Sequence, residues 1–451
     1  MSVNVDMTEG KILSKMMKFF LPIFWGGFLQ QIYQMTDALI VGWFNGKVAF
    51  GALDVTGNFI RLPLVLFMGL ATGASIVIAQ SYGGHNDKRL KDSLHTMIAF
   101  GVIAGILMSL LMILLTPAMT KMMQVPEEMV HYTQRYMYSL FGGMIFSFLY
   151  NMGYGILRAL GDSKRPFQYL VISLILNVAL DFFFVGALKL DTLGAGIATI
   201  MSQAVTTILV LRAMTKLDPV YALRAQDIRI SKNHLREILI LGMPIALQSM
   251  AYPFTNIFTQ RIINSYGTDM VVAWGVVGKI DFLVWMLIDA LSVTVSTFVA
   301  QNFGAKNFTR IREGMRVGTG LMLAMVIPVS VFLYYFGAPI GRIFVRDAEP
   351  LRIVTMIFQV VFAPYFLFQA VGDLLAGSIR GTGNTLHPML IYSIAISGFR
   401  LVWIFFIYPL APSELMTLLS FPISWALMGI TVVIYYFTAH RRRMARLAQM
   451  T

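Results

Sequence analysis

The sequence predicts an all-α membrane protein with twelve transmembrane helices in two six-helix lobes, related by a pseudo-two-fold axis along the membrane normal. The 451-residue chain is 57% hydrophobic and only 13% charged, whereas soluble domains are about 25% charged. Its apolar residues form long runs, and the landmarks of the first half return in the same order in the second half. These observations exclude an ordinary soluble domain.

Each predicted span is an apolar run of about 20 residues or more, long enough to cross a hydrocarbon core of about 30 Å. Runs such as "MIAFGVIAGILMSLLMILLTPAM" and "LVISLILNVALDFFFVGALKL" contain few charges. Several runs exceed the minimum length, so we expect these helices to tilt or to extend beyond the bilayer. The expected spans cover residues 18–43, 52–80, 93–115, 131–157, 167–188, 193–215, 237–264, 271–301, 317–336, 353–379, 387–408 and 416–438.

The distribution of basic residues predicts the orientation of the chain. Lys and Arg crowd the amino-terminal segment, every second connection and the tail "HRRRMAR", so most of the 35 basic residues lie on one side. By the positive-inside rule both termini are cytoplasmic, and we expect a multi-pass protein of the inner or plasma membrane. The net charge of +13 follows from this orientation and from attraction to anionic lipid, so it does not indicate a nucleic-acid partner.

An internal repeat with an offset of about 222 residues divides the chain into two copies. It overlays Pro22 on Pro244, "SIVIAQSYGGHNDKR" on "STFVAQNFGAKNFTR", and "GILRALGDSKRP" on "GSIRGTGNTLHP". Because each copy holds an even number of spans, both copies enter the membrane in the same orientation. We expect an amino-terminal lobe over residues 1–216, a cytoplasmic linker over 217–236, a carboxy-terminal lobe over 237–440 and a basic cytoplasmic tail over 441–451.

Two aspartates inside the predicted spans are candidates for a functional site. An ionised carboxylate at the centre of a spanning helix costs about 2.5 to 3.5 kcal/mol, so Asp37 and Asp181 each need a partner or a water-filled cavity. Asn177 lies four residues before Asp181, on the same helical face, and Thr199 reaches a similar depth from the outer side. Two carboxylates in one apolar pocket need a cation, for which protons, sodium or a cationic substrate would compete.

The first span contains further candidates. Pro22 removes a backbone hydrogen bond and should kink the helix beneath Asp37, either as a moving part or as a static bend. Gln30, Tyr33 and Gln34 share a helical face with Asp37 and are therefore candidates for lining a substrate cleft.

Taken together, these residues resemble the multidrug and toxic compound extrusion (MATE) family of transporters, and more narrowly its DinF-like branch. The resemblance covers essentially the whole chain. It rests on "GASIVIAQSYGG" with "VSTFVAQNFGA", on "LRALGDSKRP" with "IRGTGNTLHP", and on the aspartate that closes the first span. It implies two lobes of six helices that export substrates against a cation gradient. It also implies a cation site in the amino-terminal lobe, and the matching residues are Pro22, Asp37, Asn151, Asn177, Asp181 and Thr199.

The resemblance leaves the coupling ion open. A proton is one alternative, and a sodium ion held by Asp37, Asn177, Asp181 and Thr199 is the other, while no other metal and no cofactor is expected. Asn151 and Thr199 would serve helix association equally well. The NorM-like branch instead uses carboxylates in the carboxy-terminal lobe, but here the seventh-span stretch "PIALQSMAYPFTNIF" has no acid and the tenth-span position is Gln369.

The carboxy-terminal lobe carries intramembrane charges of its own, namely Lys279, Asp281, Asp289, Asp373 and Arg400. The tripeptide "KID" at residues 279–281 fits a structural ion pair. Asp289 and Arg400 are candidates for contact with substrate or for ion pairs, and the sequence does not decide between these roles.

The sequence predicts a secondary active antiporter that exports amphipathic, cationic organic compounds, either drugs or metabolites, in exchange for protons or sodium by alternating access. The alternative is a lipid-linked sugar flippase of the same superfamily, which would need a strongly basic cleft to hold a pyrophosphate. No nucleophile or metal constellation is evident inside the spans, so the sequence does not predict an enzyme. We expect small organic molecules and the bilayer as partners, no nucleic acid, and a monomer.

Overall fold

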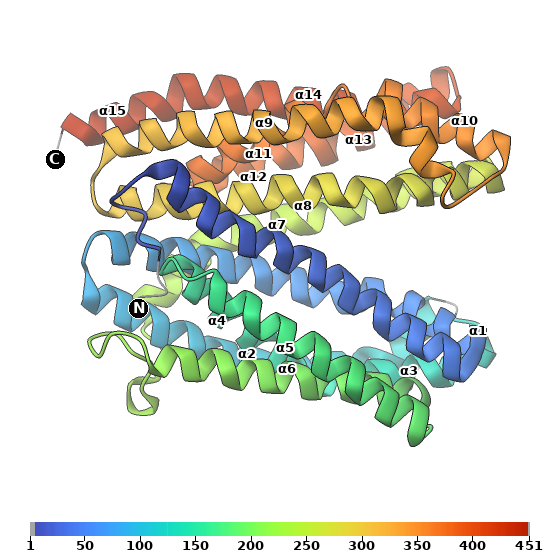
Figure 1. Cartoon of the computed structure of the whole chain (residues 1–451), viewed down its shortest axis with the longest axis horizontal. Coiled ribbons are helices and arrows are strands. Elements are labelled where there is room, and N and C mark those ends of the chain that lie inside the picture. The colour runs from blue at the N-terminus through green and yellow to red at the C-terminus, as the bar shows by residue number, and fades with distance from the viewer. Residues whose placement is uncertain (1–4, 124, 450–451) are drawn as a thin grey trace. The chain divides into compact units, whose positions relative to one another are not determined.

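The structure is a computed structural model that describes residues 5–123 and 125–449, without the side chains of Gln34, Asp54, Val55, Asn58, Phe59 and Leu62. The described chain is helical and contains no strand (Figure 1). Ten helical segments of the described chain are long and apolar enough to cross a membrane. The number rises to twelve if each of two bent helix pairs is counted as one further span. The prediction of an all-α membrane protein is therefore confirmed.

Every predicted span falls on a helix or on a bent pair of helices. In the first half these are α1 (Ile12–Gly83), α2 (Asp87–Met122), α3 (Glu127–Gly142), α4 (Met144–Ala159), α5 (Lys164–Asp181), the π-helix η1 (Phe182–Ala187), α6 (Asp191–Thr215), the short 3₁₀ turn η2 (Ala225–Asp227) and α7 (Lys232–Ser265). In the second half they are α8 (Thr268–Gly304), α9 (Phe308–Gly341), α10 (Ala348–Met356), η3 (Ile357–Phe362), α11 (Phe366–Gly381), α12 (Leu386–Tyr392), η4 (Ser393–Gly398), α13 (Phe399–Val402), η5 (Trp403–Ile407), η6 (Tyr408–Leu410), α14 (Glu414–Tyr435), η7 (Tyr436–His440) and α15 (Arg441–Gln449).

Helix α1 contains two successive spans, Ile12–Leu53 and Pro63–Gly83. Gly46, with φ 78° and ψ −173°, breaks the helical backbone within the first of these segments, and this break lies in the gap that the sequence predicts between residues 43 and 52. A residue with a Cβ adopts this backbone only at a cost, so glycine suits the position. Pro22 lies within the helical part of α1, where the backbone dihedral angles stay helical. The pairs α3 with α4 and α10–η3 with α11 are bent by 50° and 49°.

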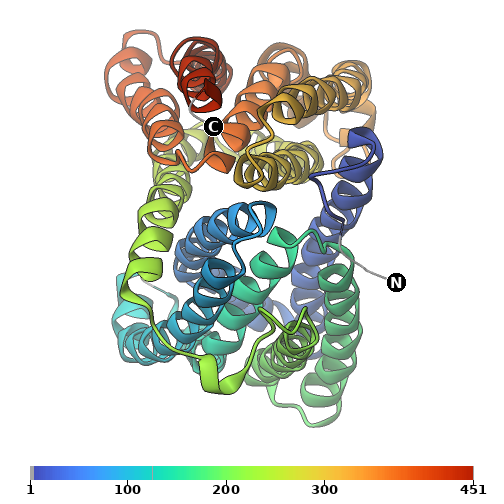
Figure 2. The ribbon, with the colours of Figure 1, turned by 90° about the vertical axis from the view of Figure 1, so that its left-hand side faces the viewer.

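The described chain forms two compact units. Unit 1 contains the described residues up to Asp6 together with Leu21–Ala246, and unit 2 contains Met7–Phe20 together with the described chain from Leu247 onward. Within each unit the helices pack as a bundle, seen nearly end-on in Figure 2. The predicted linker over residues 217–236 thus lies wholly in unit 1, and the division falls later in α7 than the predicted start of the second lobe.

The first part of α7 belongs to unit 1 because its backbone lies against the second span of α1. A Cβ on Gly73 would lie 2.4 Å from the backbone N of Gly242, and a Cβ on Gly69 would lie 2.4 Å from the Cα of Ala246. Small residues let two helix backbones approach this closely inside a membrane, where dispersion contacts rather than the hydrophobic effect hold helices together.

The segment before α7 is held on the amino-terminal end of α2. The Nζ of Lys91 lies 2.7 Å from the Oδ2 of Asp227, and the backbone N of Arg224 donates to the Nε2 of His95 at 3.1 Å. The hydrogen bond from Lys91 lowers the pKa of Asp227. The predicted linker is therefore a docked segment.

The repeat extends to the local geometry of the turns. Asn86 caps α2, and its side chain accepts a hydrogen bond from the backbone N of the third residue after it at 3.1 Å. Asn307 caps α9 in the same way at 3.0 Å. Gly161 and Gly383, which the repeat also overlays, have φ values of 86° and 81°. The two copies thus share backbone conformation as well as sequence.

The amino-terminal segment is bound within unit 2 by Arg310. This guanidinium donates hydrogen bonds to the carbonyl oxygens of Met7 (3.0 Å), Glu9 (2.8 Å) and Gly10 (2.8 Å). The Met7 side chain is fully buried, and its backbone N donates to the Oε1 of Gln301 at 3.0 Å. Hydrogen bonds from a charged donor contribute about 1.5–3 kcal/mol, so Arg310 is the main anchor of this segment.

We expect the substitution Arg310→Ala to release the amino-terminal segment, because three backbone carbonyls lose their charged donor. Limited proteolysis and amide hydrogen exchange of residues 7–10 should both accelerate. Arg312→Ala is the matched control, since Arg312 is an exposed arginine on the same helix turn of α9. Equal protection of residues 7–10 in the two variants would contradict this assignment.

We expect Gly161→Ala to destabilise unit 1 more than Gly267→Ala destabilises unit 2. Both glycines have positive φ, which costs an L-residue about 1–2 kcal/mol. Only at Gly161 would the new Cβ also meet an atom closely, the carbonyl O of Val5 at 2.3 Å, whereas nothing lies within 4 Å at Gly267. Thermal unfolding of the two purified variants tests this order, and equal midpoints would show that Val5 simply moves aside.

Candidate functional site

Asp37 lies in α1 and is almost completely buried, with 5% of its surface exposed. Its Oδ2 accepts a hydrogen bond from the Oγ1 of Thr199 on α6 at 3.0 Å. The same hydroxyl also lies 3.0 Å from the carbonyl O of Ala195, the usual partner of a threonine inside a helix. The predicted similarity in depth of Asp37 and Thr199 is thus realised as a direct contact between helices that are far apart in the sequence.

Asp181 and Asn177 adjoin Asp37 from α5. Both side chains are fully buried, and the Asp37 carboxyl interacts with the Asp181 carboxyl and with the Asn177 side chain. Asp181 ends α5, and the chain continues directly as the π-helix η1. Single π-helical turns are often found at functional sites, because they shift side chains out of the ordinary helical register. The structure therefore brings together four of the predicted site residues.

The polar atoms of this cluster are incompletely satisfied. Within the described residues, neither acid forms an ion pair with a base. The Oδ1 of Asp37, both carboxylate oxygens of Asp181 and both amide atoms of Asn177 are buried without a hydrogen bond of ordinary geometry. Buried polar atoms are nearly always paired in folded proteins. A proton shared between the carboxyls, or a hard cation that prefers oxygen ligands, would supply the missing partner.

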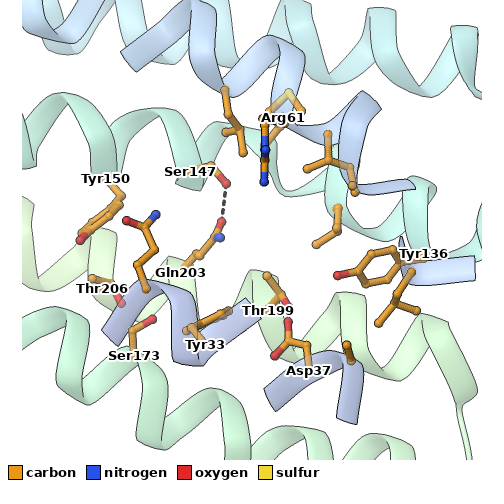
Figure 3. Close-up of a pocket in the computed structure, with 18 of the residues that line it drawn as sticks. Tyr33, Asp37, Arg61, Tyr136, Ser147, Tyr150, Ser173, Thr199, Gln203 and Thr206 are labelled. Atoms are coloured by element: carbon orange, nitrogen blue, oxygen red, sulfur yellow. Dashed lines mark hydrogen bonds between the residues drawn. The ribbon is translucent and has the colours of Figure 1, made fainter. Parts of the chain in front are cut away.

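A cavity of about 390 Å³ lies inside unit 1, and Asp37 and Thr199 form part of its wall (Figure 3). Asp181 and Asn177 are not among its lining residues, so they support Asp37 from behind the wall. Most of the lining is apolar or neutral polar, which is usual for the binding site of a small organic molecule. The cluster of buried polar groups and the cavity therefore share one carboxylate, that of Asp37.

Three further predicted residues line this cavity. They are Gln30 and Tyr33 on α1 and Asn151 on α4. Tyr33 is hydrogen bonded to the Oγ of Ser202 at 2.7 Å, and the Nδ2 of Asn151 donates to the carbonyl O of Ser147 at 2.7 Å. The predicted contribution of Gln34 falls on a side chain outside the described residues.

Sequence reasoning missed several polar residues of the cavity wall, namely Arg61, Tyr136, Ser147, Tyr150, Ser173, Gln203 and Thr206. The hydroxyl of Ser147 donates to the Oε1 of Gln203 across two helices. One signal was available, because Thr199, Gln203 and Thr206 recur with helical spacing along an otherwise apolar span. Arg61 also gave a signal, because it falls inside the predicted span 52–80, where a charged side chain is a candidate functional residue.

The expected ion pair between Lys279 and Asp281 in α8 is wrong. Lys279 Nζ lies over the ring of Phe344, 5.5 Å from its centroid, whereas Asp281 Oδ2 accepts a hydrogen bond from Trp285 Nε1 at 2.7 Å. Residues two apart on a helix point in different directions, which explains why the two charges do not meet.

Of the remaining intramembrane charges predicted in the carboxy-terminal lobe, Asp373 has neutral partners. Asp373 accepts a hydrogen bond from the Nε2 of Gln369 at 2.6 Å and another from the hydroxyl of Tyr392. Asp289 is exposed and close enough to Asp373 for the two charges to interact.

Arg400 is fully buried within unit 2. Its Nε donates to the Oγ of Ser424 at 2.9 Å, and its guanidinium carbon lies 4.2 Å from the ring centroid of Phe421 and 5.3 Å from that of Tyr252. No described acid forms an ion pair with it, so the expectation of an ion pair is wrong for Arg400. Aromatic faces stabilise a desolvated guanidinium and take the place of a carboxylate here. Neither Arg400 nor Asp289 lines the cavity of unit 1.

Comparison with known proteins tests both the predicted repeat and the family resemblance. The MatE family profile matches the chain twice, over residues 22–183 and 244–406. Each match begins at one of the two overlaid prolines, which confirms the predicted internal repeat.

The chain is 27% identical over 456 residues to a "Probable multidrug resistance protein YoeA" of Bacillus subtilis, covering 99% of this chain and 98% of that protein. Its fold is similar to a crystal structure described as MATE in the bent conformation, with a TM-score of 0.89 and 18% identity over 99% of this chain and 98% of that one. It is also similar to the MATE transporter VcmN of Vibrio cholerae in the bent form, with a TM-score of 0.86 and 20% identity over 96% and 97% of the two chains.

The duplicated profile covers most of the chain, and the fold agrees with it over nearly the whole length. The cavity inside one helical unit is consistent with a protein that moves small molecules across a membrane. The chain belongs to the MatE family, the multidrug and toxic compound extrusion transporters.

Proposed function

We propose that this transporter is a secondary active antiporter, which exports amphipathic organic compounds carrying a positive charge in exchange for protons or sodium. One observation carries the proposal: Asp37 and Asp181 interact with each other, both are buried without a base among the described residues, and Asp37 forms part of the wall of a cavity. Two such carboxylates bind positive charge strongly, because leaving both ionised in an apolar environment is costly. Positive charge on a substrate and a coupling cation compete for the same acids.

Competition of this kind couples the two fluxes. A ligand can shift the equilibrium between the outward-facing and inward-facing states only by as much free energy as its binding to the two states differs. In our proposal the coupling cation binds Asp37 and Asp181, with Thr199 and Asn177 as neutral oxygen donors, and displaces the substrate. Asn151, Gln30 and Tyr33 contact the substrate from the cavity wall. Pro22 supplies the flexible point of the first span, where α1 lacks a backbone hydrogen bond.

The orientation and assembly follow from the sequence. We place the protein in the plasma membrane with both termini in the cytoplasm, as the positive-inside rule requires, and we propose that it works as a monomer. A lipid-linked sugar flippase is less suited to this cavity, because Arg61 is the single base among its described lining residues and a pyrophosphate calls for several.

We expect Asp37→Asn and Asp181→Asn each to reduce gradient-driven efflux by about tenfold or more, because a hydrogen bond to a charged group contributes about 1.5–3 kcal/mol. Efflux of a fluorescent organic cation from proteoliposomes, under an imposed proton or sodium gradient, is the measurement. The gradient that drives efflux by the native protein identifies the coupling ion.

Asp281→Asn is the matched control, since Asp281 is an intramembrane acid of unit 2 that is bonded to Trp285. Its efflux should remain close to that of the native protein. Unchanged gradient-driven efflux in both unit 1 variants would refute the proposed coupling site, and a loss in Asp281→Asn alone would move the site to unit 2.

We expect Thr199→Val to strengthen proton binding at Asp37 by about fivefold if the coupling ion is a proton, because the lost hydrogen bond stabilises the ionised carboxylate by about 1 kcal/mol. If the coupling ion is sodium, the same variant should weaken its binding, because the site loses a neutral oxygen ligand. Thr199→Ser keeps the hydroxyl and should retain the native affinity. The measurement is the dependence of the initial efflux rate on external pH or sodium concentration. If valine and serine behave alike, Thr199 serves only to pack α6 against α1.

A further inference from the structure

Arg61 lies in the wall of the unit 1 cavity and has no role in the proposed cation site. It belongs to α1, just before the span that begins at Pro63. Its side chain is exposed, and Figure 3 shows it pointing into the cavity from the side opposite Asp37. A basic side chain therefore faces the space that an organic substrate would occupy.

The guanidinium of Arg61 is unpaired within the described part of the chain. No described residue forms a hydrogen bond or an ion pair with it, and it forms none with Asp37. Arg400 of unit 2 differs in this respect, because aromatic rings and a serine hydroxyl surround its guanidinium. An arginine with five free N–H donors at a cavity is available to bind an acceptor from outside the protein.

The cavity carries one charge of each sign. Among its described lining residues Asp37 is the acid and Arg61 is the base, and the other polar groups are neutral hydroxyls and amides. Because the two charges do not pair with each other, they give the cavity a negative side and a positive side. A molecule with only a positive charge interacts with Asp37 and leaves Arg61 without a partner.

The chemistry of arginine indicates which group it binds. Its planar guanidinium makes two parallel hydrogen bonds to a carboxylate, sulfonate or phosphate, so it recognises such groups with a defined orientation. A cavity of about 390 Å³ accommodates a drug-sized molecule with space between two charged groups. The three tyrosines of the wall, Tyr33, Tyr136 and Tyr150, supply flat surfaces for an aromatic body.

We propose that Arg61 recognises an acidic group on the substrate, so that the cavity selects amphipathic zwitterions over simple organic cations. The positive end of the substrate lies towards Asp37, and its carboxylate, sulfonate or phosphate lies at Arg61. This inference rests on the proposed export function for its setting, and it assigns a substrate class to the same cavity. It adds a specificity-determining residue that plays no part in coupling.

The test uses two dyes that differ only in the acidic group, a rhodamine with a free carboxylate and the methyl ester of the same dye. Binding to the full-length protein in lipid nanodiscs is measured by fluorescence anisotropy, and transport of both dyes is measured in proteoliposomes. The variants are Arg61→Gln, which removes the charge, and Arg61→Lys, which retains it.

We expect the native protein to bind the free acid more tightly than the ester. Arg61→Gln should weaken binding of the free acid by about tenfold, the effect of losing a charge-assisted hydrogen bond, and should leave the ester unchanged. Arg61→Lys should keep part of the preference for the acid. The proposal is overturned if the native protein does not prefer the free acid. It is also overturned if the ratio of the two affinities is the same in Arg61→Gln as in the native protein, because Arg61 would then contact only lipid headgroups.

The binding and transport measurements together distinguish a failure of this proposal from a failure of the proposed function. If Asp37→Asn retains gradient-driven efflux of both dyes while Arg61→Gln loses its preference for the acid, the coupling site fails and the role of Arg61 stands. If Asp37→Asn abolishes efflux while the ratio of affinities is the same in Arg61→Gln and the native protein, the coupling site stands and the role of Arg61 fails.

Discussion

The adjacency of two buried carboxylates governs the chemistry of unit 1. Asp37 and Asp181 meet without a base from the described part of the chain, where several of their oxygen atoms and both amide atoms of Asn177 also have no hydrogen-bond partner. Such a cluster is unfavourable unless positive charge enters it, since membrane helices offer no water to solvate an ion. The fold tolerates this cost because the surrounding helices hold the acids in place, with Thr199 fixing the carboxylate of Asp37.

Comparison of the two units shows how duplication can keep a scaffold and change its charges. The turns of the repeat retain the same caps and the same positive φ values, which depend on backbone conformation. Two intramembrane acids of unit 2 have neutral donors, with Gln369 and Tyr392 bonded to Asp373 and Trp285 bonded to Asp281. In unit 1 Asp37 and Asp181 adjoin each other, and two neighbouring carboxylates need an external cation more than a single hydrogen-bonded acid does. We therefore propose that coupling belongs to unit 1.

Much of the candidate site could be anticipated from residue type and spacing. An aspartate in an apolar span is rare enough to attract notice alone, and the spacing of Asn177 and Asp181 places them on one face. The cavity wall was harder to foresee. Ser147 and Gln203 are ordinary polar residues until α4 and α6 bring them together. Arg61 falls inside the predicted span 52–80, but only the fold shows that its side chain faces the cavity.

The sequence by itself determined the helical spans, the repeat, the break near Gly46 and the candidate acids. These depend on local properties, because membrane helices satisfy their own backbone hydrogen bonds and apolar length decides which segments insert. Only the tertiary structure decided which polar groups meet. Thr199 contacts Asp37 across 162 positions of the chain, and Ser147 contacts Gln203 across 56 positions. The physical reason is that the rotation and packing of each helix, which no local pattern specifies, set the direction of every side chain.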